Sequence, residues 1–161
     1  MKKINELSGE SRIWIYQPER AMSIVEADYA KEKLESFIDE WSSHGQKMEA
    51  SAEIFHNRFL VIAADEAKAT ASGCGIDKSV HFVKELGAAM NLDFFKRTQV
   101  VYRENGKMEE VELNLFWAKR KAGLIDDSTI LFDNTIRKVS DMENNWEVPF
   151  SKSWHAEMWL K

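Results

Sequence analysis

The run 59–64 constrains the fold of this chain more than any other stretch of its sequence. Its residues (FLVIAA) are all apolar, so a strand formed by them presents apolar side chains on both faces. Such a strand has to lie inside a sheet that is covered on both sides. The preceding segment, 48–54, alternates apolar with polar residues, which predicts a half-exposed strand joined to it by a turn at 55–58. We therefore expect a hairpin at the centre of the fold.

A long helix and a short strand are predicted before this hairpin. Residues 12–16 are rich in strand-forming types, and Pro18 closes the run. Ser23 and Glu26 then have the spacing of a capping box, which predicts a helix start. Apolar residues follow at three- and four-residue steps as far as Trp41, so this helix has one buried face and should end at Gly45.

The second half of the chain predicts two more helices, a second hairpin and a last strand. The hairpin is centred on Asn105-Gly106, a pair that favours a tight type I′ turn. Asn114 is a suitable cap for a short helix, and Gly123 is a suitable end for it. The remaining elements are assigned by apolar spacing and strand composition: a helix at 77–90, the short helix at 115–122 and a strand at 129–132.

The predicted order of elements is β-α-β-β-α-β-β-α-β, in which hairpins outnumber obligatory crossovers. This order favours an α+β fold with a mixed or mainly antiparallel sheet and with helices packed mainly on one face. Its first six elements match those of a ferredoxin-like unit. A length of 161 residues predicts a single domain over 1–161, with a loose leader at 1–11 and a tryptophan-rich tail at 144–161 packed on it.

Charge and composition argue against several classes of protein. A net charge of −5 argues against a general nucleic-acid partner, because phosphate neutralisation supplies most of that affinity. No stretch reaches the ~20 apolar residues of a membrane span. The single cysteine leaves no intramolecular disulfide, and the four histidines are too widely spaced to predict a metal site. We expect a cytoplasmic protein that has no membrane partner.

The stretch 65–81 is the first candidate for a functional site. A loop of small residues brings the only cysteine to the start of the predicted helix at 77–90, where unpaired N–H groups favour anions. The expected ligand is a small anionic or phosphorylated molecule, and the cofactor is unknown. The ligand contacts are assigned to the glycines that shape the loop and to the first helical residues: Gly73, Gly75, Asp77, Lys78 and Ser79.

Cys74 and His81 are the candidate catalytic residues of this stretch. The helix dipole and Lys78 would stabilise a Cys74 thiolate, and His81 would serve as its base. The alternative is a small buried cysteine that fills a gap between strand and helix. For Asp77 the alternative is a purely structural N-cap, and for Lys78 and Ser79 it is a solvated surface. The hypothesis for this stretch is therefore the binding of an anionic ligand, with thiol chemistry at Cys74 as an additional step, and it leaves open whether the chain is an enzyme.

The tail offers a second hypothesis, that of a non-enzymatic interaction module. Trp146, Pro149, Trp154 and Trp159 would form an aromatic surface covered by a partner or by a second copy in a homodimer. The alternative is that these side chains cap the core of their own domain.

Three segments carry a resemblance to known proteins: 72–74, 76–82, and the tail 145–149 with Trp154-His155. Here the chain resembles a family of small, uncharacterised bacterial proteins that often carry the description "ABC transporter ATPase". The similarity runs over most of the chain from Trp14 onward. It implies no activity, because none is established for that family.

The residues themselves argue against ATP hydrolysis of the transporter type. A phosphate-binding loop of that type continues from Ser-Gly-Cys-Gly directly into Lys-Ser, whereas here Ile76-Asp77 separates Gly75 from Lys78. The apolar strand with its terminal acids, Asp65 and Glu66, precedes this loop, which reverses the usual order. The match to a phosphate-binding loop is therefore degenerate.

Overall fold

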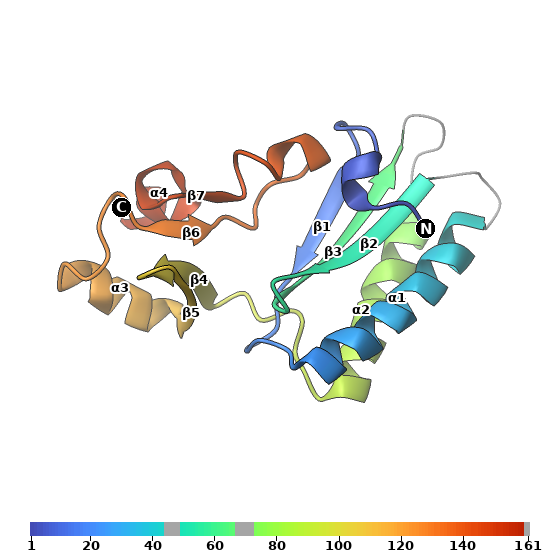
Figure 1. Cartoon of the computed structure of the whole chain (residues 1–161), viewed down its shortest axis with the longest axis horizontal. Coiled ribbons are helices and arrows are strands. Elements are labelled where there is room, and N and C mark those ends of the chain that lie inside the picture. The colour runs from blue at the N-terminus through green and yellow to red at the C-terminus, as the bar shows by residue number, and fades with distance from the viewer. Residues whose placement is uncertain (44–48, 67–72, 160–161) are drawn as a thin grey trace. The chain divides into compact units, whose positions relative to one another are not determined.

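The computed structural model describes residues 1–43, 49–66 and 73–159, and the chain divides into two compact units (Figure 1). Unit 1 comprises Met1–Lys96 with Arg137–Ser140, and unit 2 comprises Arg97–Ile136 with Asp141–Lys161. Each unit has its own antiparallel sheet, with helices packed on it. The predicted α+β class is confirmed. The single-domain organisation is not tested by this division and stays a prediction.

Unit 1 is built on a three-stranded sheet with the strand order β1-β3-β2. Its strands are β1 (Arg12–Tyr16), β2 (Glu49–Phe55) and β3 (Phe59–Asp65). β3 lies between the other two, and its side chains from Phe59 to Ala64 are 0% exposed. The apolar run therefore forms the buried central strand that its sequence predicts.

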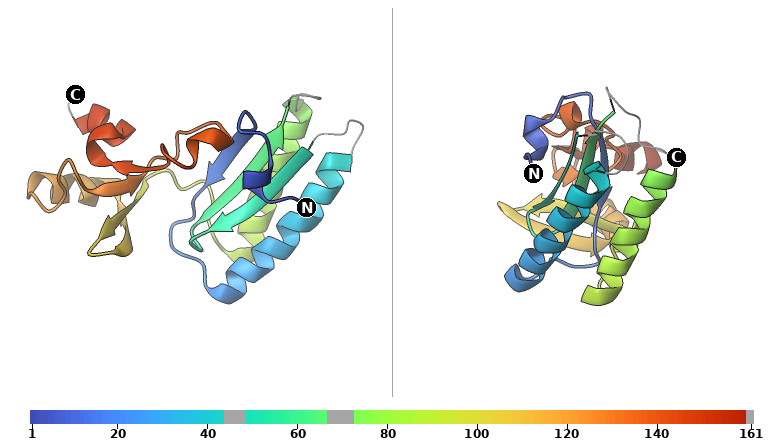
Figure 2. Two further views of the ribbon diagram at one scale, coloured as in Figure 1. Left: turned by 45° about the horizontal axis from the view of Figure 1, so that its top comes forward. Right: turned by 90° about the vertical axis from the view of Figure 1, so that its right-hand side faces the viewer.

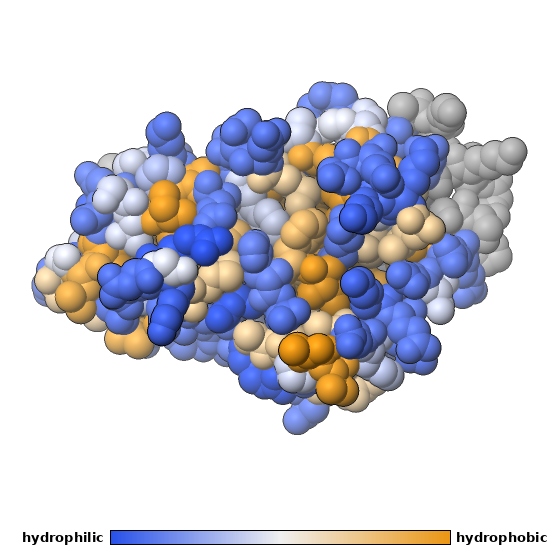
Figure 3. Space-filling model, in the orientation of Figure 1, coloured by the Kyte–Doolittle hydropathy of each residue, from blue (hydrophilic) through white to orange (hydrophobic). Residues whose placement is uncertain are grey.

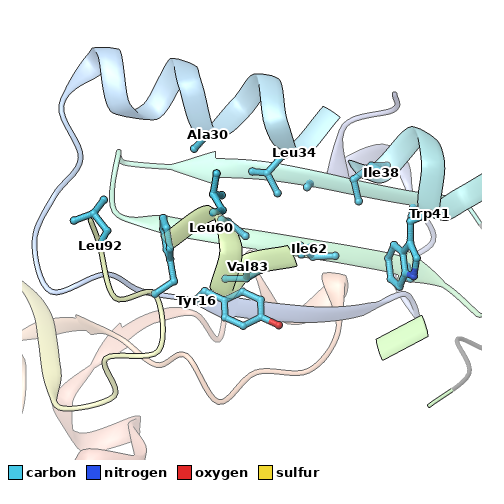
Figure 4. Close-up of a cluster of buried hydrophobic side chains, with 14 of the residues drawn as sticks. Tyr16, Ala30, Leu34, Ile38, Trp41, Leu60, Ile62, Val83 and Leu92 are labelled. Carbon is cyan, nitrogen blue, oxygen red and sulfur yellow. The ribbon is translucent and has the colours of Figure 1, made fainter. Parts of the chain in front are cut away.

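Helices α1 (Ile24–Ser43) and α2 (Gly73–Met90) cover the same face of this sheet (Figures 1 and 2). Their apolar stripes meet the side chains of the strands in one buried cluster, which Figure 4 shows. The predicted stripe of α1 is confirmed, because every third or fourth residue from Ala30 to Trp41 points into it. The labelled members are Tyr16, Ala30, Leu34, Ile38, Trp41, Leu60, Ile62, Val83 and Leu92.

The start of α1 is fixed by the predicted capping box. The backbone N–H of Glu26 donates to Ser23 Oγ at 3.1 Å, and the Ser23 N–H donates to Glu26 Oε1 at 2.9 Å. Arg20 adds two parallel hydrogen bonds to the same carboxylate, at 2.8 and 2.9 Å. These bonds from Arg20 and Ser23 lower the pKa of Glu26 to about 2. The first turn of α1 is therefore determined by local sequence.

We expect Ser23→Ala to lower the free energy of unfolding of unit 1 by about 1 kcal/mol, because the Glu26 N–H loses its acceptor. Urea denaturation followed by circular dichroism measures the change. Ser36→Ala is the matched control, since Ser36 is an exposed residue inside the same helix and alanine there has a higher helix propensity. An equal loss in both variants would contradict a capping role for Ser23.

The outer edge of β1 is occupied by a segment from far along the chain. Lys138 forms an antiparallel bridge with Arg12. The Ile13 N–H donates to the Arg137 carbonyl at 3.0 Å, and the Val139 N–H donates to the Ser11 carbonyl at 3.0 Å. A ferredoxin-like unit requires the strand that follows α2 to join the same sheet as the first three strands. Here that strand belongs to the sheet of unit 2, so the ferredoxin-like arrangement is wrong.

Unit 2 contains a four-stranded antiparallel sheet with the order β5-β4-β6-β7. The predicted type I′ turn joins β4 to β5, because Asn105 and Gly106 both have positive φ, at 51° and 78°. The strands are β4 (Gln99–Glu104), β5 (Lys107–Glu112), β6 (Ile130–Phe132) and β7 (Glu147–Pro149). The helices are α3 (Leu113–Lys121) and α4 (Trp154–Trp159), and the 3-10 turns of the chain are η1 (Ile4–Glu6), η2 (Val139–Asp141) and η3 (Phe150–Lys152).

Helix α3 begins two residues before its predicted start. Its N-cap is Glu112, whereas the predicted cap, Asn114, lies in the first turn and accepts the Leu115 N–H at 2.8 Å. Leu113 packs against the core of unit 2, which extends the helix beyond what its capping signal indicates. The predicted end is confirmed, since Gly123 follows the helix with a φ of 79°.

The core of unit 2 lies between one face of its sheet and the helices. The buried ring of Phe116 contacts the rings of Tyr102, Phe150 and His155. The other buried members are Val100, Ile125, Leu131 and Val148. Among the described residues of both units, no helix is long and apolar enough to cross a membrane.

Candidate functional site

The first predicted site falls at the start of α2, which begins earlier than expected. The helix starts at Gly73, so Gly73 and Gly75 lie in its first turn and Asp77 lies inside it. The prediction that Asp77 caps this helix is therefore wrong. Ile76 packs against the core of unit 1, and this contact stabilises a first turn that its glycines disfavour. Residues 67–72 and the side chain of Cys74 lie outside the described part of the structure.

The described side chains of this stretch diverge. Ser79 is buried, and its hydroxyl donates to the Ile76 carbonyl at 2.7 Å. Lys78 is exposed, as is His81, whose Nε2 lies 3.0 Å from Glu85 Oε1. The geometry therefore does not support Ser79 and Lys78 as joint contacts of an anion. Anion binding and the catalytic roles of Cys74 and His81 stay predictions.

Glu66, the second of the two acids at the end of β3, pairs with an arginine of β1. The Glu66 carboxylate lies 3.5 Å from a guanidinium nitrogen of Arg12, which in turn lies over the Trp14 ring at 4.7 Å. Within residues 1–43, 49–66 and 73–159, no group of three or more histidine, cysteine or acidic side chains could hold a metal ion.

The second predicted site, the tryptophan-rich tail, divides into buried and exposed residues. Trp146 is buried, its ring packs edge-on against Phe132, and its indole N–H donates to Asn134 Oδ1 at 2.9 Å. The prediction that Trp146 belongs to an aromatic surface is therefore wrong, because its ring and its N–H are both satisfied inside the protein. Pro149 is half-buried in β7.

Helix α4 carries the exposed aromatic side chains. Trp159 is 37% exposed and stacks on Trp117 of α3, with ring centroids 5.6 Å apart and an interplanar angle of 29°. Met158, its neighbour in sequence, is 54% exposed, and Trp154 is half-buried. We call Trp117, Met158 and Trp159 the aromatic face of unit 2.

Charged side chains of both signs accompany the aromatic face. The last turn of α3 carries Lys119, Arg120 and Lys121, while Glu157 is exposed on α4. Arg120 is held in place, because its guanidinium lies 4.5 Å from the Phe150 ring centroid and donates to Asp127 at 2.6 Å. The exposed Lys121 and Glu157 are therefore the groups of opposite charge that these two helices present to solvent.

The deep burial of the His155 side chain is a feature that the sequence does not predict. It is 3% exposed and lies against Trp154, Phe116 and Trp117, with ring centroids 3.9, 5.8 and 6.5 Å away. Its Nδ1 has no hydrogen-bond partner among the described residues. Burial lowers the pKa of His155 to about 4, although the charge of Asp133 acts in the opposite direction. In the sequence, the four-residue spacing between His155 and Trp159 indicates that both lie on the same side of a helix.

Unit 1 has an apolar surface of its own at the first turns of α1. Ile24, Val25 and Tyr29 are exposed there, and Figure 3 shows apolar side chains gathered at this end of the helix. Arg20 and Glu26 pair with each other beside it. This surface contains two aliphatic side chains and one aromatic side chain at the start of a helix, so it provides a comparison for the aromatic face.

The chain finds no match among protein-family models, curated proteins or solved structures, so its resemblance to the bacterial family stays a prediction and its function has to be argued from this geometry.

Proposed function

We propose that this chain is a non-enzymatic interaction module that forms a homodimer through the aromatic face of unit 2. The observation that carries the proposal is the stack of Trp159 on Trp117, together with the substantial exposure of Met158 and Trp159 on the same helix. Aromatic residues and methionine are enriched where protein surfaces associate, and tryptophan is frequent among the residues that dominate binding energy.

The shortness of α4 supports the same proposal. An isolated helix of fewer than about 12 residues is marginal in water, and within the described residues α4 comprises Trp154–Trp159. It is tied to the rest of unit 2 by the ring contacts of its aromatic residues, by the packing of Ala156 on the core, and by the Trp154 N–H, which donates to Asp133 Oδ2 at 3.1 Å. A partner that covers Met158 and Trp159 would bury apolar area on this short helix.

A second copy is favoured as the partner by the charges beside the face. A two-fold axis brings each surface against its own copy, so an apolar centre meets an apolar centre. Lys121 of one copy can then lie opposite Glu157 of the other, and the reverse. Because each chain carries a net charge of −5, an interface with both signs also limits the repulsion between copies.

The test is the oligomeric state of the full chain and of a variant with a charge in the aromatic face. We expect the wild type to sediment as a dimer at pH 7 and Met158→Glu to be a monomer, because a second carboxylate beside Glu157 would be desolvated in the interface. We expect Trp159→Ala to raise the dissociation constant about 30-fold, which corresponds to the ~2 kcal/mol of an interface hot spot.

Val25→Ser, on the exposed surface of α1, is the matched control and should leave the dissociation constant unchanged. Circular dichroism of each variant verifies that the fold is retained. A wild-type chain that stays monomeric up to about 1 mM would overturn the proposal. Dissociation by Val25→Ser and not by Met158→Glu would move the interface to α1 and would also overturn it.

A further inference from the structure

We infer that His155 makes α4 a pH-dependent latch: the neutral imidazole holds α4 against α3, and protonation of the imidazole releases the helix. The inference goes beyond self-association, because it concerns the docking of α4 within a single chain. The geometry behind it is that His155 is the most deeply buried residue of α4 and contacts Phe116 and Trp117 of α3.

The surroundings of His155 accept a neutral ring and disfavour an imidazolium. The rings of Phe116, Trp117 and Trp154 surround it, and its Nδ1 has no hydrogen-bond partner among the described residues. A protonated imidazole donates from both nitrogens, so a charged His155 would leave a buried donor without an acceptor. An unpaired buried charge is far more costly than an unpaired neutral group.

The charged groups on the neighbouring elements do not remove this cost. Asp133, which follows β6, carries a negative charge that raises the pKa of the imidazole. Its Oδ1 already accepts the N–H and the hydroxyl of Thr135, and its Oδ2 accepts the Trp154 N–H. Arg120 of α3 pairs with Asp127, and Glu157 of α4 is exposed to solvent. A positive charge on His155 is therefore attracted to Asp133, but its Nδ1 has no acceptor among the described residues.

The sign of the pH dependence follows from proton linkage. The pKa of His155 is lowered to about 4 when α4 is docked, and a released helix returns it to the ordinary value of about 6.5. The released state then binds the proton more tightly, so docking is strongest above pH 6.5 and weakens as the pH falls toward 4. Between pH 7 and pH 5 the equilibrium constant for release rises roughly 20-fold.

Release of α4 would also affect the homodimer, and this part of the inference rests on the proposed function. Met158 and Trp159 both belong to α4, so its release separates them from Trp117 and takes the aromatic face apart. The dissociation constant of the homodimer should therefore rise as the pH falls from 7 to 5.

The latch is tested by amide hydrogen exchange in the full chain at pH 7 and pH 5, corrected for intrinsic rates. The Met158→Glu background keeps the chain monomeric, so the result does not depend on the dimer. We expect exchange at Trp154 and Ala156 to rise roughly 20-fold at pH 5, while the amides of β4 and β6 keep their protection. His155→Phe should abolish the rise, and His56→Asn, which suits the positive φ at that exposed turn, should preserve it.

Three results would overturn the latch: no rise at α4, an equal rise throughout unit 2, or a rise that persists in His155→Phe. NMR titration of the wild-type chain gives the pKa of the His155 imidazole without any substitution. A pKa near 6.5 would also overturn the inference. If α4 behaves as expected in the monomer but the wild type never dimerises at pH 7, only the proposed function fails.

Discussion

Replacing Phe116 by alanine is expected to lower the free energy of unfolding of unit 2 by about 3–5 kcal/mol. Its side chain is 0% exposed, and its ring lies 5.8 Å from the ring of Tyr102 on the sheet and 6.1 Å from that of Phe150 on η3. Removing the ring loses the free energy gained by burying it and leaves a cavity where α3, η3 and the sheet meet.

The loss can be measured by urea denaturation followed by tryptophan fluorescence, since Trp117 and Trp154 lie beside the site in unit 2. Leu115→Ala is the matched control, because Leu115 precedes Phe116 in the same helix but is half exposed to solvent. We expect that control to cost less than about 1 kcal/mol. A similar cost for the two variants would show that Phe116 is not the centre of this core.

Replacing Gly87 by alanine is the second change with a large expected effect, a loss of about 3 kcal/mol from unit 1. A Cβ atom at position 87 would lie 2.5 Å from the carbonyl oxygen of Leu92. That oxygen belongs to the backbone of the turn that ends α2, where the Leu92 N–H donates back to the Gly87 carbonyl at 2.9 Å. The clash therefore opposes the hydrogen bond that closes the helix end, and no side-chain rotation relieves it.

The sign of the Gly87→Ala effect distinguishes this explanation from helix propensity. In a helix without the close contact, glycine to alanine raises stability by roughly 0.5–1 kcal/mol. Ala88→Gly at the exposed neighbouring position is the control, and it should cost about that amount. Thermal or urea unfolding of both variants gives the comparison. A stabilised Gly87→Ala protein would contradict the tight turn after α2.

The parts of the fold that the sequence predicts well are those governed by residues close together in the chain. The capping box of Ser23 and Glu26 and the positive φ pair at Asn105-Gly106 act over two to four residues, and both are confirmed. The central position of β3 was predicted for a different reason. A run that is apolar on both faces has only one stable environment in a sheet.

The parts that could not be predicted depend on residues that are distant in sequence. Nothing near Lys138 indicates that it pairs with Arg12, and nothing in β4 indicates that it joins β6 in a separate sheet. The start of α2 was misplaced because glycine propensity is a local quantity, whereas the burial of Ile76 is a tertiary one.

The same distinction applies to the candidate sites. Tryptophan content indicates that the tail is packed, but only the structure separates the buried Trp146 from the exposed Trp159. Ser79 follows Lys78 in the predicted anion site, yet the helix turns its hydroxyl toward the Ile76 carbonyl. His155 has an ordinary sequence context, and its unusual properties arise from α3, which precedes it by more than thirty residues.

The pairing of residues 137–140 with β1 can form only long after β1 itself has been synthesised. After Lys96 the ribosome has to add a further 44 residues, 97–140, before the edge of β1 can be covered. At about 5–20 residues per second, this takes roughly 2–9 s. Throughout that interval the nascent chain presents an unpaired strand edge to its neighbours, including other chains on the same messenger RNA. Each newly made molecule would thus pass through an aggregation-prone stage that ends only when the last quarter of its sequence emerges.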